Sequence, residues 1–234
     1  MTIWILLSGI IAPAIFWIGY FYYNDRFQPE PVRNLGISYL LGFGAAFLCF
    51  KFYSLLPYLG IPDDPSILME SQRIQFFFYS LGIIGLVEEL FKLLPFLLVI
   101  FLFKAFDEKI DGIIYASMIA LGFASFENLY YLVYLEGFEL FGRAFASPLT
   151  HTIFASIWGY IIGKARIENK SLLKALFIGL PIAAFSHGIF NFFTTSPALR
   201  IAAAVTILII WIWRIRVLER AGKKKVENKG KTHN

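Results

Sequence analysis

The sequence has little of what a soluble or disulfide-stabilised domain requires. Its 234 residues include one cysteine, Cys49, so neither an internal disulfide nor a multi-cysteine zinc site can form. Charged residues make up only 16 % of the chain, and no polar block is long enough to build a soluble domain. The first 23 residues lack the basic region and the cleavage site of a signal peptide, so we expect a retained membrane span there.

Apolar residues are present in excess. They make up 58 % of the chain, against roughly 45–50 % in soluble domains, and the mean hydropathy is +0.67. Apolar windows of about 20 residues predict membrane-spanning helices, so the fold class is an all-α, polytopic transmembrane helix bundle of about seven spans. We expect one integral-membrane domain over 1–215 and a basic tail over 216–234. The predicted spans are about 3–23, 35–56, 75–103, 110–134, 147–165, 172–193 and 197–215.

The direction of the spans follows from lysine and arginine, which tend to stay on the cytoplasmic side. With the carboxyl terminus inside, the inner segments hold sixteen of the 21 basic residues, and the outer segments hold only Arg73, Arg143 and Arg200. This asymmetry predicts an outside amino terminus and a cytoplasmic carboxyl terminus. The expected location is a cell membrane, the bacterial inner or plasma membrane.

The basic tail is open to two interpretations, binding of nucleic acid and attraction to anionic membrane lipid. It directly follows a span and carries no aromatic residues for stacking on bases, so we expect attraction to anionic membrane lipid and no nucleic-acid partner.

A polar layer interrupts four of the predicted spans at one depth, between the membrane centre and its outer face. Within two of the helices the polar residues lie three or four positions apart and therefore share a face, and in the fourth span Phe123 and Glu127 are four positions apart. Its members are Glu88, Glu89 and Lys92 in the third span, Glu127 and Asn128 in the fourth, His151 in the fifth, and His187 and Asn191 in the sixth.

An inert packing role for this layer would be costly. A charge at the centre of a membrane helix costs about 2.5–3.5 kcal/mol, and Glu88, Glu89 and Glu127 have one nearby cation, Lys92, which we interpret as a structural counter-ion to Glu88. For His151 taken alone, the alternative is a solvent-exposed position near the membrane interface with no role in the site.

The residue types of the layer suit peptide-bond hydrolysis. A buried carboxylate can take a proton from water, a histidine can orient that water, and Asn191 with a histidine can donate to the developing oxyanion. No serine or cysteine nucleophile stands out. Zinc is the open alternative, with His151, His187 and one or two glutamates, Glu127 among them, as ligands, although no HExxH motif is present. Because asparagine is a poor zinc ligand, we expect that no ion is required.

The ordered motifs "EELFK" (88–92), "FASFEN" (123–128), His151 and "HGIFN" (187–191) resemble those of PrsW-type intramembrane proteases. The segment "DRFQPEP" (25–31) resembles the acidic loop after their first span. The resemblance implies a glutamate-dependent peptidase that makes the first, extracytoplasmic cut in a single-span membrane protein such as an anti-sigma factor. These proteins are similar to the wider CAAX prenyl endopeptidase and bacteriocin-processing group, where the place of Glu127 is usually histidine, so we expect His151 to take over the orientation of water.

Two other function classes remain open at this point. Intramembrane glutamate and histidine also form relays in proton- or ion-coupled transporters, which often carry inverted repeats; we detect none. The third class is a non-catalytic scaffold. The oligomeric state, the activating signal and the cleavage site cannot be read from the sequence.

Overall fold

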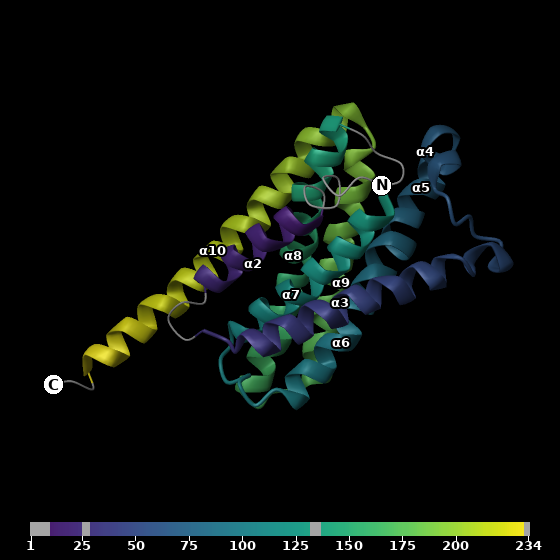
Figure 1. The fold of residues 1–234 in the computed structure, drawn as a ribbon. Coiled ribbons are helices and arrows are strands. Elements are labelled where there is room, and N and C mark those ends of the chain that lie inside the picture. Colours follow the sequence, from purple (N-terminus) through teal and green to yellow (C-terminus); the bar gives the residue numbers. More distant parts are fainter. Residues whose placement is uncertain (1–9, 25–28, 132–136, 232–234) are drawn as a thin grey trace.

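The structure, a computed structural model, describes residues 10–24, 29–131 and 137–231 (Figure 1). Every regular element in these ranges is a helix, which confirms the all-α prediction for the described residues. In chain order the elements are α2 (Ala12–Asn24), α3 (Val32–Tyr53), η2 (Leu56–Leu59), α4 (Ser66–Ser71), α5 (Arg73–Tyr79), η3 (Ser80–Val87), α6 (Glu88–Leu102), α7 (Asp111–Tyr131), α8 (Gly137–Ile167), α9 (Leu172–Thr194), η4 (Pro197–Leu199) and α10 (Arg200–Lys231).

Four segments of the described chain are helices long and apolar enough to cross a membrane. They correspond to the second, fourth, sixth and seventh predicted spans, while the total of seven and the orientation of the two ends stay predictions. The four segments are Val32–Tyr53, Asp111–Tyr131, Leu172–Thr194 and Pro197–Arg220.

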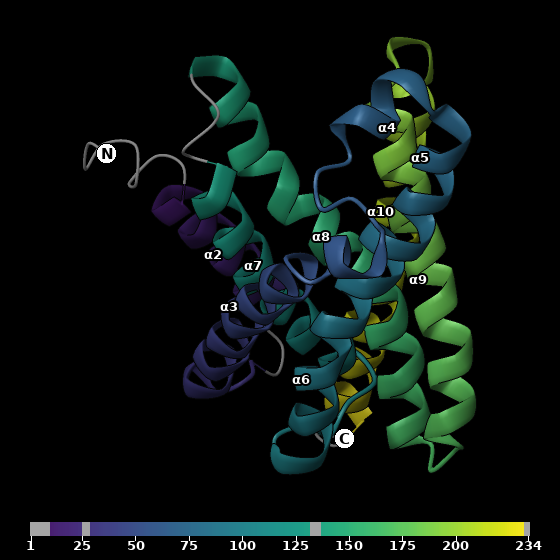
Figure 2. The ribbon, with the colours of Figure 1, turned by 90° about the vertical axis from the view of Figure 1, so that its right-hand side faces the viewer.

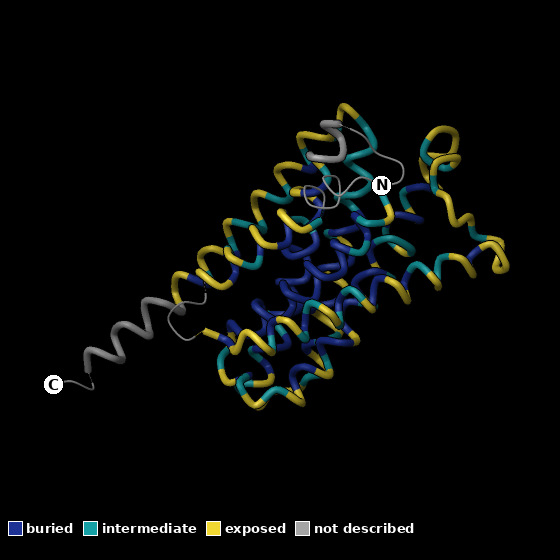
Figure 3. Tube along the Cα trace, viewed as in Figure 1, coloured by how far each residue is buried: buried dark blue, intermediate teal, exposed yellow. Residues whose placement is uncertain are grey.

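Helix α7 is the centre of the bundle. Of its 21 residues, 17 are buried, and α3 and α8 pack along it. Figures 2 and 3 show α7 enclosed by its neighbours, with the buried residues concentrated in the middle of the molecule. Of the helices that bear the site, α6 and α8 pack on α7, and α9 packs on α8 and η3.

Glycine permits the close approach of α7 to α8. A Cβ on Gly112 would lie 2.1 Å from the carbonyl oxygen of Gly159, and Gly163 also packs on Gly112. The four-residue spacing of Gly159 and Gly163 is typical of such a close approach between membrane helices.

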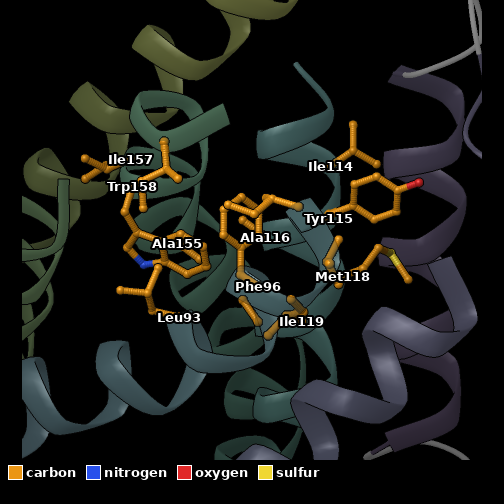
Figure 4. Packing of buried hydrophobic residues seen from close by; sticks show 14 of the residues in the cluster. Leu93, Phe96, Ile114, Tyr115, Ala116, Met118, Ile119, Ala155, Ile157 and Trp158 are labelled. Carbon is orange, nitrogen blue, oxygen red and sulfur yellow. The ribbon is translucent and has the colours of Figure 1, made fainter. Parts of the chain in front are cut away.

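Aromatic packing joins α6 to α8. Figure 4 shows Leu93 and Phe96 of α6 beside Trp158 of α8, and the Phe96 and Trp158 rings meet edge to face with centroids 4.9 Å apart. Trp158 is fully buried. This packing fixes the direction of its indole N–H, which reaches the polar layer.

The third predicted span, 75–103, is not one uniform helix. The chain passes from α5 through the π-helical η3 and into α6, which continues through Pro95. A long π segment is rare, and single π turns are frequent at functional sites. Here it ends directly before Glu88.

A separate polar cluster lies at the beginning of α7, and we name Glu30, Asn34, Asp111 and Tyr115 the capping cluster. Asp111 Oδ2 accepts hydrogen bonds from the backbone N–H groups of Asp107 (2.9 Å) and Glu108 (2.6 Å). The Tyr115 hydroxyl donates to Glu30 and accepts from Asn34. Residues 25–28 of the "DRFQPEP" segment lie outside the described residues.

Helix α10 packs beside α8 and α9, its Trp211 ring meets the Trp17 ring of α2, and it then continues past the bundle (Figure 1). Arg214 is buried within it, donates to Ser117 Oγ at 3.1 Å and lies over the Phe21 ring. Because the helix is continuous across residue 215, the division between domain and tail at that residue stays a prediction.

Candidate active site

Glu88 and Glu89 occupy the first turn of α6 and are buried, as is Lys92 one turn later. The backbone of η3 presses against α9 just before them. A Cβ on Gly85 would lie 2.3 Å from the carbonyl oxygen of Ala184, and one on Gly188 would lie 2.5 Å from that of Ser80. The segments that carry Glu88 and His187 are thus in backbone contact.

Glu89 has partners at both carboxylate oxygens. Lys92 Nζ lies 2.7 Å and His187 Nδ1 lies 3.0 Å from Oε1, and the Trp158 indole N–H donates to Oε2 at 2.7 Å. Lys92 therefore balances the charge of Glu89 more closely than that of Glu88, whose Oε2 is 3.6 Å from Nζ. With both oxygens engaged, Glu89 holds other groups in place.

Glu127 plays the same part beside the other histidine. Its Oε2 lies 2.7 Å from His151 Nε2, and its Oε1 lies 2.8 Å from an Arg143 nitrogen. Arg143 also stacks on the Tyr131 ring, with its guanidinium 3.6 Å from the ring centroid. The negative charge of Glu127 is thus compensated by the half-buried Arg143 of α8.

These contacts leave three atoms facing one another. Glu88 Oε2 lies 3.8 Å from His151 Nδ1 and 3.8 Å from His187 Nε2, and all three atoms lie within 4.8 Å of one another. Within the described residues, Glu88 Oε2 and His151 Nδ1 have no hydrogen-bond partner. The far side of Glu88 is held, since the Tyr53 hydroxyl donates to Oε1 at 3.2 Å.

This arrangement fits a metal ion. Three ligands at about 2.1 Å from tetrahedral zinc lie about 3.4 Å apart, close to the two 3.8 Å separations. Catalytic zinc sites keep three protein ligands and one open position, and each ligating histidine donates its other N–H to a carboxylate or carbonyl. Here Glu127 and Glu89 are those acceptors, which leaves His151 Nδ1 and His187 Nε2 with free lone pairs.

The group differs by one residue from the ligand set predicted from the sequence. Glu88, and not Glu127, joins His151 and His187, because both oxygens of Glu127 already have partners. The structure thus contains a three-residue group that can hold a metal.

The two asparagines are placed differently. Asn128 donates to the Ala144 carbonyl at 3.3 Å and so ties α7 to α8. Asn191 lies one turn beyond His187, and among the described residues its side-chain nitrogen has no partner. It remains available as a donor.

Three residues that contact the glutamates of the site were not predicted from the sequence, namely Tyr53, Arg143 and Trp158. Trp158 follows His151 by seven residues and therefore shares its helix face, a signal that was readable. Tyr53 comes from α3, 35 residues before Glu88, and no spacing rule connects the two.

The model of the "PrsW family intramembrane metalloprotease" family matches residues 30–215. A protein named Protease PrsW from Oceanobacillus iheyensis is 32 % identical over 225 residues, covering 95 % of this chain and 99 % of that protein. Protease PrsW from Bacillus subtilis is 28 % identical over 218 residues, covering 92 % and 95 %, and that from Clostridioides difficile is 30 % identical over 214 residues, covering 88 % and 85 %. No solved structure matches the chain.

Proposed function

The chain belongs to the PrsW family of intramembrane proteases, and we propose that it is a metal-dependent endopeptidase whose ion is held by Glu88, His151 and His187. As a family member it is a hydrolase and a multi-pass integral membrane protein. The observation that carries the proposal is the convergence of one carboxylate oxygen and two imidazole nitrogens whose opposite sides are held by other residues.

The side chains divide into two roles. Glu88 Oε2 is the carboxylate oxygen of the three glutamates that has no hydrogen-bond partner in the described residues, so Glu88 contacts the reacting centre. Glu89 and Glu127 position the histidines and keep each one in the tautomer that presents a lone pair inward. Lys92 balances the charge of Glu89.

A divalent ion held there would supply Lewis-acid polarisation of the scissile carbonyl. Asn191 supplies a neutral N–H donor for the oxygen that gains negative charge, and replacing it with alanine should lower turnover by about 10²–10³-fold. Packing around Trp158 and Phe123 excludes bulk water from the site, which strengthens these electrostatic contacts.

The substrate in this proposal is a single-span membrane protein, such as an anti-sigma factor, that is cut near the predicted outer face of the membrane. The resemblance of the motifs and the depth of the polar layer support this choice. Membrane lipid is the second expected partner. Nothing in the described residues favours a transporter, and the family is a protease family.

The test uses the purified full-length protein in lipid nanodiscs and a panel of single-span membrane proteins. We expect about one zinc per chain by mass spectrometry, loss of cleavage after chelation and recovery when zinc is restored. Full cleavage by protein that contains no metal would contradict the proposed ion and return the site to the metal-free hydrolysis expected from the sequence. In that case Glu88 is the general base.

A further inference from the structure

We propose that Tyr53 is a positioning residue that turns Glu88 toward the two histidines. The inference rests on the proposed function and adds a member to the site from α3, a helix that the motifs leave out. Tyr53 does not touch the reacting atoms. It acts through the carboxylate of Glu88.

The geometry places the Tyr53 hydroxyl on the side of Glu88 that faces away from the histidines. The hydroxyl lies 3.2 Å from Glu88 Oε1 and 3.4 Å from the Ile83 carbonyl oxygen. A phenol has one hydrogen to donate, and an ionised carboxylate is the stronger acceptor. The contact therefore anchors Oε1 and leaves Oε2 toward His151 and His187.

Without this anchor, Glu88 has a competing orientation. Lys92 Nζ lies 3.6 Å from Oε2, and glutamate has three side-chain torsions, so an unanchored carboxylate can turn to the ammonium group. His151 and His187 are each held by a carboxylate on their far side. Tyr53 fixes the third member of the group, Glu88, in the same way.

The Tyr53 ring is itself fixed by packing. It lies beside Phe50, with ring centroids 5.9 Å apart, and contacts the apolar cluster that contains Cys49, Val87 and Phe91. The hydroxyl is thus presented from a rigid support, as a positioning group requires. Its second neighbour, the Ile83 carbonyl, belongs to the π-helical η3.

The primary experiment measures cobalt affinity from the visible absorption of Co²⁺ bound to full-length protein in nanodiscs. Tyr53→Phe keeps the ring and removes only the hydroxyl, and we expect it to weaken Co²⁺ binding by about 10–100-fold. The matched control is Tyr58→Phe, which removes a hydroxyl from a side chain that is 86 % exposed. This control should leave the affinity unchanged.

A second measurement does not depend on metal. A double-mutant cycle of Tyr53→Phe and Glu88→Ala, which removes the acceptor, followed by thermal unfolding without added metal, should give non-additive shifts because the two side chains are in contact.

The outcomes separate the two proposals. If wild-type protein binds Co²⁺ and Tyr53→Phe binds it equally well, Tyr53 has no positioning role and the inference is wrong. If wild-type protein binds no metal, the proposed ion fails and the cycle decides: non-additive shifts retain Tyr53 as the holder of Glu88, and additive shifts overturn it.

Discussion

The two ends of α7 carry two buried polar clusters that differ in how their carboxylates are used. At its beginning, Asp111 accepts two backbone N–H groups and Glu30 accepts the Tyr115 hydroxyl. At its other end, Glu127 holds His151 so that an imidazole nitrogen faces the free oxygen of Glu88. Burial of carboxylates is common to both clusters, and at the second a carboxylate oxygen of Glu88 and a ring nitrogen of His151, both without hydrogen-bond partners in the described residues, face each other.

The difference separates stability from activity. Polar groups that are fully paired contribute to folding, whereas a group of unpaired acceptors in a membrane interior is unfavourable until a ligand or substrate binds. We therefore expect substitutions in the capping cluster to lower stability and substitutions around Glu88 to lower activity.

The largest effect is expected at Glu88. Glu88→Gln keeps the size of the side chain and removes its charge, and it should lower cleavage by about 10³-fold or more without loss of thermal stability. Asp111→Asn is the matched control, since it changes a carboxylate at the other end of α7, and the folded variant should retain its turnover. Wild-type cleavage by Glu88→Gln would remove Glu88 from the catalytic machinery.

An intermediate effect is expected at Glu127. Glu127→Gln removes the charge that fixes His151, and it should reduce metal affinity or turnover by about 10–100-fold, less than the change at Glu88. Titration with Co²⁺ and steady-state kinetics measure the two quantities. Equal losses for the two variants would make Glu127 a ligand in its own right.

A change in stability alone is expected at Tyr115. Tyr115→Phe removes the donor to Glu30 and should lower the free energy of unfolding by about 1 kcal/mol, while kcat and KM stay at the wild-type values. Denaturation in mixed micelles and cleavage assays on the same preparation check both parts. A fall in kcat with unchanged stability would mean that the capping cluster communicates with the site.

The smallest effect is expected at Glu168, in the turn between α8 and α9. Hydrogen bonds from Lys109 and Lys170 lower the pKa of its carboxyl from 4.5 to about 2. A lowered pKa in the folded state contributes stability above pH 4.5, and this contribution is lost as the pH falls toward 2. Melting curves of wild type and Glu168→Gln should differ slightly at pH 7 and converge near pH 2; a difference that persists at pH 2 would exclude this origin.

The sequence revealed the helical class and the residues of the polar layer for a physical reason. Charged groups in apolar runs are conspicuous, and helical rise converts their positions into depths, so Glu88, Glu127, His151 and His187 were placed at one level. The structure brings these four side chains into one group. Their catalytic roles stay predictions.

What sequence reasoning missed depends on side-chain direction across helices. Depth alone does not say which oxygen of Glu88 is free, that Glu127 lies behind His151, or that Tyr53 reaches Glu88 from α3. It also does not reveal η3, because an apolar run has the same appearance in a π-helix and in an α-helix. The group that can hold a metal contains Glu88 where the sequence named Glu127, and this difference also depends on side-chain direction.

The π-helical η3 gives the site a dependence on chain length. Gly85 meets α9 at Ala184, and Glu88 meets the same helix at His187, with two residues between them. Each residue of a helix rotates the chain about the helix axis, so deleting either Leu86 or Val87 would turn one of these contacts away from α9 even though no polar side chain is lost. We therefore expect insertions and deletions in this apolar stretch to damage the site, and exchanges of one aliphatic residue for another to have a much smaller effect.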